Sequence, residues 1–228
     1  MGDRGKLWLS TYPVLRDDVS WLSPTDPWRQ DHGIEWINFA PGGFGQFHEA
    51  RYQRRCGRGL LDAVAFYRDY EGLLVFLADP RWQPEGGYYL VPDGYAYGLE
   101  VTRELPVSPR LTFVGQVVYT KSHDDATGGD IPYTPEWTAR VGAHYKDAAG
   151  WRLDGTLRFT GRREHRFADG STRRLGSYGT LDARISRQLS TTWEVFLRGS
   201  NLLDRDYDHW YGFPELGRHV AAGFEHRF

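Results

Sequence analysis

The stretch that decides the fold is the carboxyl terminus, Gly217-Arg-His-Val-Ala-Ala-Gly-Phe-Glu-His-Arg-Phe228. Every second residue, counted back from the end, belongs to a mostly apolar set: Phe228, His226, Phe224, Ala222 and Val220. The interleaved residues are polar or small. A period of two is typical of a β-strand that separates two different environments. The chain is therefore predicted to end in a strand with one apolar face and an aromatic last residue.

The same alternation recurs upstream. Leu153, Leu157 and Phe159 share one set of alternate positions, whereas Asp154 and Arg158 belong to the other. Turn signals separate nine segments of this kind, and a further short strand is predicted near residues 6–12. The nine segments are residues 47–55, 59–70, 95–105, 111–121, 136–146, 151–161, 178–189, 193–200 and 217–228. The pattern predicts an all-β, antiparallel fold.

The two faces of these strands suit a membrane. The polar face carries full charges at mid-strand, and the apolar face carries aromatic residues near its ends. The stretch from Trp137 to Tyr145 has nine residues, as does that from Trp151 to Phe159. A tilted strand needs about 9 to 11 residues to cross a bilayer, with aromatic girdles at both interfaces. The predicted girdle residues are Tyr119, Trp137, Tyr145, Trp151, Phe159, Trp193 and Phe228.

The connections alternate between short and long. Short ones span 56–58, 106–110, 147–150 and 190–192, and long ones span 71–94, 122–135, 162–177 and 201–216. Short periplasmic turns and long extracellular loops are typical of outer-membrane barrels. We therefore expect the last strand to run toward the periplasm. Residues 1–45 lack a sustained period and are predicted to be a loop-rich extracellular segment, and residues 46–228 form the barrel part.

Composition narrows the function. A mean hydropathy of -0.60 and 25% charged residues argue against a bundle of membrane helices, but a transmembrane β-barrel has such values because polar residues line its interior. The net charge of -2 gives no reason to expect a nucleic-acid partner. Neither the eight histidines nor the single Cys56 has metal-ligand spacing. We expect no enzyme activity, no cofactor and no metal site.

The segments Gly199-Ser-Asn-Leu-Leu-Asp-Arg-Asp-Tyr207, Tyr211-Gly-Phe-Pro214 and Gly217-Arg218, with the terminal Phe228, closely resemble the carboxyl-terminal end of TonB-dependent receptors. The residues that carry the motif are Asn201, Leu202, Asp204, Tyr207, Gly212, Pro214, Gly217 and Arg218. Weaker similarity extends the resemblance to about residues 47–228. His226 departs from it, since the family usually has an aromatic residue there.

The resemblance implies a partial transmembrane β-barrel, with about 9 or 10 of the family's 22 strands, located in the cell outer membrane. It implies import of a scarce nutrient, such as an iron–siderophore complex or cobalamin. The expected partners are the lipid bilayer, a small-molecule ligand and the barrel assembly machinery, which would recognise the closing strand at Val220, Ala222, Phe224, His226 and Phe228. Contact with the TonB complex would require a plug domain and TonB box. We expect the chain to lack these parts and a signal peptide, and so to be the carboxyl-terminal part of a receptor.

A long connection supplies candidate ligand contacts: Arg162, Arg163, Arg166, Arg173 and Arg174. Arginine forks suit carboxylate and phosphate oxygens, although attraction to the anionic outer leaflet would also explain them. The pairs Asp124-Asp125 and Glu164-His165 also lie in predicted extracellular loops, where solvated side chains are the favoured interpretation over ligand contacts.

The tyrosines at 88, 89, 95 and 97 are predicted to belong to the outer girdle more readily than to a pocket. Asn201 and Asp204 are predicted to set the turn after the penultimate strand by bonding nearby backbone groups. Two other classes remain open: a small complete outer-membrane barrel with a structural or adhesive role, and a soluble β-sandwich binding module.

Overall fold

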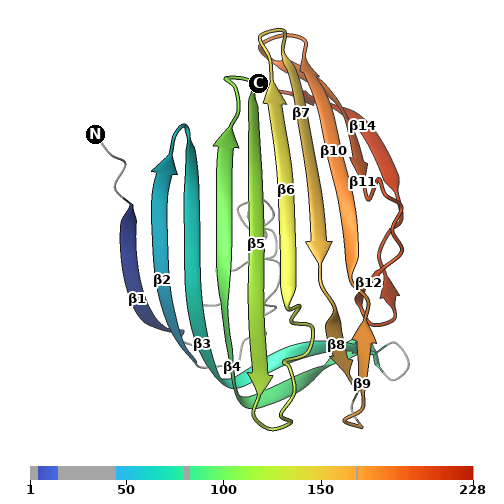
Figure 1. Cartoon of the computed structure of the whole chain (residues 1–228). Coiled ribbons are helices and arrows are strands. Elements are labelled where there is room, and N and C mark those ends of the chain that lie inside the picture. The colour runs from blue at the N-terminus through green and yellow to red at the C-terminus, as the bar shows by residue number, and fades with distance from the viewer. Residues whose placement is uncertain (1–4, 15–44, 80–82, 168, 228) are drawn as a thin grey trace.

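The computed structural model describes residues 5–14, 45–79, 83–167 and 169–227. Its main element is a curved, ten-stranded antiparallel sheet with strand order β1-β2-β3-β4-β5-β6-β7-β10-β11-β14 (Figure 1). These strands are β1 Lys6–Val14, β2 Gly45–Cys56, β3 Gly59–Asp79, β4 Gln83–Pro106, β5 Leu111–Asp124, β6 Trp137–Lys146, β7 Trp151–Thr160, β10 Tyr178–Gln188, β11 Trp193–Ser200 and β14 His219–His226. Two small hairpins accompany the sheet: β8 Arg163–Arg166 with β9 Thr172–Leu175, and β12 Asp208–Trp210 with β13 Phe213–Pro214.

All nine predicted strands are present, and the short strand predicted near residues 6–12 is β1, which pairs with β2. Residues 15–44 lie outside the described residues. The assignment of residues 1–45 to an extracellular segment stays a prediction.

The prediction of a loop over 71–94 is wrong, because β3 and β4 continue through most of it. Beyond the sheet the two strands form an arm that bends across one end of it, toward the β8–β9 hairpin (Figure 1). The bend coincides with Gly72, whose φ of 69° lies in the left-handed region. Gly72 lies between the pairs Glu71↔Asp93 and Leu73↔Val91, across from Pro92. Both residue types interrupt regular strand geometry, so they account for the local bend.

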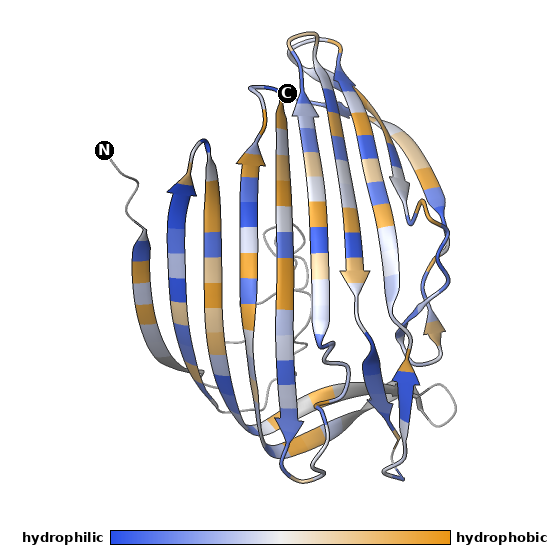
Figure 2. Ribbon diagram, in the orientation of Figure 1, coloured by the Kyte–Doolittle hydropathy of each residue, from blue (hydrophilic) through white to orange (hydrophobic). Residues whose placement is uncertain are grey.

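The register aligns apolar residues into a continuous outer face. Val141 lies opposite Leu157, which lies opposite Leu181 on β10. Val141 is 52% exposed and Leu157 is 45% exposed. Figure 2 shows hydrophobic and hydrophilic residues alternating along these strands. In the described part of the chain no second sheet covers this face, as the alternative of a soluble β-sandwich would require.

The opposite, inner face is polar and heavily paired. One cross-strand row runs through Gln53, Asp62, Thr102, Gln116 and Arg140. Toward β14, the carboxylate of Glu194 pairs with Arg152 at 3.0 Å and with Arg184 at 3.2 Å. The charged residues, which occupy alternate positions in the middle of the strands, therefore face the concave side of the sheet, as the alternation predicts.

The two ends of the sheet differ. The connections β2–β3, β4–β5, β6–β7 and β10–β11 are short and lie at one end, here called the turn end, and the longer connections lie at the loop end (Figure 1). β1 begins and β14 ends at the turn end, since Lys6 is opposite Gln53 and His226 is opposite Trp193. In the described residues β1 and β14 are the two edges and do not pair, so the closure that a small complete barrel requires is not formed. No helix in this part of the chain could cross a membrane.

Apolar side chains are buried together at the loop end. Phe47, Tyr70, Leu73, Val91 and Ile131 belong to one cluster, in which Val91 is completely buried. These residues come from β2, from both strands of the arm and from the loop after β5. The cluster fixes the arm against the sheet and so positions the residues of the candidate site.

Candidate functional site at the loop end

The concave face encloses a cavity of about 820 Å³. Its wall is the polar face of β2 to β6, and its loop-end border includes residues 131–135 and Trp210. The lining carboxylates include Asp62 and Glu100, and the lining guanidinium groups include Arg51 and Arg140. Both charge signs are interspersed along the wall, which gives this surface no strong preference for a cation or an anion.

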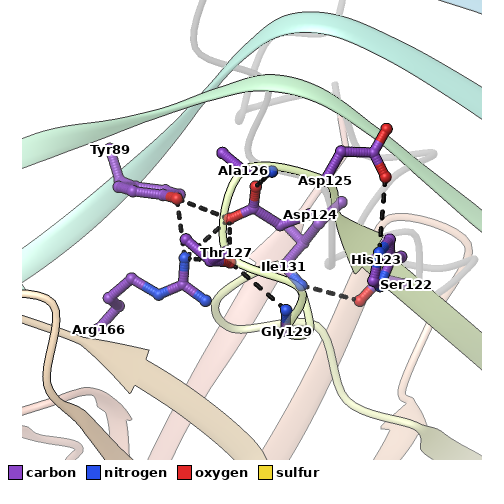
Figure 3. Close-up of polar contacts among 10 residues, drawn as sticks. All are labelled: Tyr89, Ser122, His123, Asp124, Asp125, Ala126, Thr127, Gly129, Ile131 and Arg166. Carbon is purple, nitrogen blue, oxygen red and sulfur yellow. Dashed lines mark hydrogen bonds and ion pairs between the residues drawn. The ribbon is translucent and has the colours of Figure 1, made fainter.

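Four residues from three segments meet at the loop end and form what we call the clasp: Tyr89 on the arm, Asp124 at the end of β5 with Thr127 just after it, and Arg166 on β8 (Figure 3). The Arg166 Nη1 atom lies 2.7 Å from Asp124 Oδ2, from Tyr89 Oη and from Thr127 Oγ1. The Tyr89 hydroxyl donates to Asp124 Oδ2 at 2.6 Å. Asp124 is fully buried, and Arg166 is 4% exposed. A buried ion pair with this many additional hydrogen bonds joins the three segments firmly.

Burial and hydrogen bonding act in opposite directions on Asp124. Burial disfavours its ionised form, but hydrogen bonds from Tyr89, Thr127 and Arg166 outweigh this effect and hold the pKa of Asp124 below its ordinary value. For Tyr89, burial and the bond to Asp124 raise the pKa of the phenol. The carboxylate is therefore ionised and the phenol protonated at neutral pH, which are the states that the clasp requires.

The rest of β8 is also anchored. Arg163 donates from Nη2 to the carbonyl oxygen of Asp208 at 2.9 Å and from Nη1 to that of His209 at 3.0 Å. Burial lowers the pKa of Arg163. His165 is fully buried, with Nδ1 2.7 Å from the Tyr133 hydroxyl and its ring stacked on Tyr211 at 4.8 Å. These contacts of Arg163 and His165 are all with other segments of the protein, so β8 is the strand of its hairpin that packs against the rest of the structure.

The structure separates the five candidate arginines instead of gathering them. Arg163 and Arg166 are buried and engaged within the protein, whereas Arg162, Arg173 and Arg174 are exposed. The hairpin causes this separation, because β8 packs against the rest of the protein and β9 lies on the solvent side of β8. Asp124 and His165, expected to be solvated loop residues, are both fully buried, so that expectation is wrong.

A second, smaller hollow of about 230 Å³ lies between β9 and the segment after β11. Arg173, Arg174 and Arg205 line it together with Tyr207 and Tyr211. Arg173 Nη1 donates to the Tyr211 hydroxyl at 3.2 Å and its guanidinium lies 5.2 Å from the centre of that ring. Sequence reasoning missed Arg205, which lies within the motif segment 199–207 and about thirty positions from Arg173 and Arg174.

The predicted girdle residues fall at two levels. Tyr119 and Trp137 are directly opposite each other near the loop end, with ring centroids 4.8 Å apart. Phe159 lies near the same end, whereas Tyr145, Trp151 and Trp193 lie near the turn end. Phe228 lies outside the described residues. Assignment of these levels to the membrane interfaces stays a prediction.

The four tyrosines of the predicted outer girdle divide. Tyr95 and Tyr97 extend the loop-end level of aromatic residues. The ring of Tyr95 stacks on that of Tyr67, with centroids 6.0 Å apart, and also on that of Tyr97. Tyr89 belongs to the clasp and not to a girdle, so the prediction for it is wrong. The side chain of Tyr88 lies outside the described part.

The motif after β11 builds a tight turn. Asn201 and Asp204 have φ values of 48° and 52°, in the left-handed region. Asn201 Nδ2 donates to the carbonyl oxygens of Arg205 at 2.9 Å and Leu216 at 3.2 Å, and Asp204 Oδ1 accepts from the Arg218 backbone N–H at 2.9 Å. These bonds match the turn-setting role predicted from the sequence. The other motif residues, Leu202, Tyr207, Gly212, Pro214 and Gly217, lie in the same connection, where Tyr207 stacks on Tyr178 at 3.9 Å.

Comparison with protein-family models matches residues 49–202 to the family described as "TonB dependent receptor-like, beta-barrel". The chain belongs to the TonB-dependent receptor family. Its antiparallel sheet is thus part of an outer-membrane β-barrel from a family of non-enzymatic receptors, as the resemblance implied.

Solved import receptors and a copper transporter share this fold. The ferric-catecholate import receptor Fiu from Escherichia coli K12 has a TM-score of 0.66 at 16% identity, over 98% of this chain and 33% of that one. FpvA from Pseudomonas aeruginosa, solved with a ferric pyoverdine, has a TM-score of 0.68 at 14% identity, over 99% and 31%. The copper transporter OprC gives 0.64 at 14% identity, over 82% and 31%. The chain thus spans about a third of the length of these receptors. No curated protein matches it.

Proposed function

We propose that this chain forms one part of the wall and extracellular mouth of an outer-membrane receptor that imports a scarce nutrient, such as an iron–siderophore complex or cobalamin. The observation that carries the proposal is the match of residues 49–202 to the TonB-dependent receptor barrel. Of the similar solved structures, one is a ferric-catecholate import receptor and one a complex with ferric pyoverdine, which favours iron complexes as the ligand; a third is a copper transporter.

The architecture is consistent with that role. An apolar outer face would contact lipid, and a polar inner face would line a hydrated lumen. The loop end would lie outside the cell, where ligands arrive. The barrel assembly machinery would recognise β14, and the TonB complex would act through a plug domain supplied by the rest of the receptor.

The test is nutrient uptake by the source bacterium with and without the gene for this chain. Cells are given radiolabelled ferric catecholate, ferric hydroxamate, ferric pyoverdine or cobalamin, and uptake is followed with and without an uncoupler of the inner membrane. We expect deletion to abolish the energy-dependent uptake of one of these classes, and the intact gene to restore it. Unchanged uptake of all of them would contradict the proposal.

A further inference from the structure

The β8–β9 hairpin has one anchored strand and one presented strand. On β8, Arg163, His165 and Arg166 are each bonded inward to a different segment. On β9, Thr172, Arg173 and Arg174 are exposed. The register places Arg173 opposite His165 and Arg174 opposite Glu164, so the position of β9 follows directly from that of β8.

The presented strand borders the hollow of about 230 Å³, where Arg205 approaches from the segment after β11. Arg173 and Arg174 are therefore brought next to an arginine about thirty positions away in sequence. Like charges that converge on one hollow repel each other unless they are neutralised. Asp206 and Asp208 also line the hollow, but among the described residues neither forms an ion pair with these arginines, and Asp208 Oδ2 instead accepts from the Gly212 backbone N–H at 3.1 Å.

We infer that this hollow is a preformed binding site for an oxyanion, a carboxylate or phosphate group, contacted by Arg173, Arg174 and Arg205. Planar guanidinium forks bind such groups through paired, charge-assisted hydrogen bonds. Tyr207 and Tyr211 belong to the same lining, and the Tyr211 hydroxyl accepts a hydrogen bond from Arg173. The inference deepens the proposed function, because it gives the imported or bound ligand an anionic oxygen group and assigns its contacts at the mouth of the receptor.

The anchoring of β8 explains why such a site would need little rearrangement. The clasp joins β8 to the arm and to the loop after β5, and Arg163 joins it to the Asp208 and His209 carbonyl groups. The bonds from Arg163 hold the two sides of the hollow together, because Asp208 is itself in the lining. A site whose walls are fixed before binding loses less conformational entropy when the ligand arrives. Arg163 and Arg166 are thus positioning residues, not ligand contacts.

The experiment measures equilibrium binding to the full chain in nanodiscs of zwitterionic lipid, with radiolabelled citrate and pyrophosphate as probes and glucose as the neutral control. We expect binding of at least one oxyanion, weakened by about tenfold or more in Arg174→Gln and in Arg205→Gln, since each removes charge-assisted hydrogen bonds. Arg162→Gln is the matched control: it removes the same charge from an exposed residue outside the lining, and its affinity should equal that of the unchanged chain.

A second arm identifies the source of the oxyanion. If nanodiscs that contain a phosphate-monoester lipid abolish probe binding to the unchanged chain, the lipid headgroup occupies the site; if they do not, the ligand is a solute. Either result supports an oxyanion site. Failure of citrate and pyrophosphate to bind, or equal binding by the Arg174, Arg205 and Arg162 variants, would overturn it. Energy-dependent nutrient uptake could still be intact in that case, which distinguishes this failure from failure of the proposed function.

Discussion

At the scale of single residues, Arg166 has a buried environment that constrains it through several contacts. One of its nitrogen atoms contacts three oxygen atoms, and its partner carboxylate has no exposed surface. Removing one partner of such a pair leaves a buried charge without compensation. We predict that Arg166→Ala lowers the free energy of unfolding, measured by urea titration in lipid vesicles, by about 3 to 5 kcal/mol.

The exposed Arg162 provides the control for that substitution. Arg162→Ala should change the free energy of unfolding by no more than about 0.5 kcal/mol, the range of ordinary surface substitutions. Asp124→Ala combined with Arg166→Ala should cost less than the sum of the two single changes, because the second removes a charge already unpaired. Simple additivity of the two would contradict the clasp.

Asn201 combines a left-handed backbone with side-chain bonds to two carbonyl groups. Its two contributions can be separated. We predict that Asn201→Gly, which tolerates the backbone but loses the bonds, lowers the free energy of unfolding by about 1 to 2 kcal/mol. Asn201→Ala should cost about 1 kcal/mol more, because alanine also disfavours this backbone conformation. Equal stability of the alanine and glycine variants would show that the backbone conformation is not retained.

At the scale of elements, the stability of the β8–β9 hairpin should depend on pH through the ionisation of Asp124. Its pKa in the folded state lies below that of the unfolded chain, so the clasp stabilises the fold fully above the ordinary carboxyl pKa of about 3.9 and loses its contribution as the pH falls below that value. The protection factors of the β8 amides, which correct hydrogen exchange for its intrinsic dependence on pH, should therefore fall only below about pH 4. In Asp124→Asn these protection factors should be low at neutral pH already and change little on acidification. A β8 transition near pH 6 to 7 would point to a histidine instead.

The elements differ in how well sequence predicts them. Strands inside the sheet alternate because their two faces meet different surroundings, and period-two analysis detected each of them. The arm was missed because Leu73-Leu-Val-Phe-Leu77 is an uninterrupted apolar run, which periodicity does not assign. The clasp was missed for a different reason. The three segments that carry it are 35 to 77 positions apart, so only the folded arrangement brings them together.

At the scale of the whole molecule, the central claim is that the apolar face contacts lipid and the concave face contacts water. The alternation of sequence predicted both faces, and the register of β7 with its neighbours aligned them across the sheet. The open edges were expected, since the resemblance implied only about 9 or 10 of the family's 22 strands. Curvature was beyond sequence reasoning, because it depends on contacts between strands that are distant in the chain.

Charge substitutions at adjacent positions should separate the two faces. We predict that Leu157→Arg, on the outer face near mid-strand, reduces the free energy of unfolding in vesicles by about 2 to 4 kcal/mol. Thr156→Arg, one residue away on the concave face, should cost distinctly less, because water and neighbouring polar groups can solvate the guanidinium. Comparable losses for the two variants would mean that the faces do not differ in their surroundings.

The most direct measurement of the central claim is the accessibility of spin labels along β7. Single cysteines replace Leu153, Asp154, Gly155, Thr156 and Leu157 in turn, with Cys56→Ser in each chain to remove the native thiol. Collision rates are then compared for oxygen, which concentrates in lipid, and for a water-soluble nickel chelate. We predict that labels at 153, 155 and 157 collide mainly with oxygen and those at 154 and 156 mainly with nickel. Equal accessibility at all five positions, or the opposite alternation, would contradict a sheet that spans the outer membrane with its apolar face toward lipid.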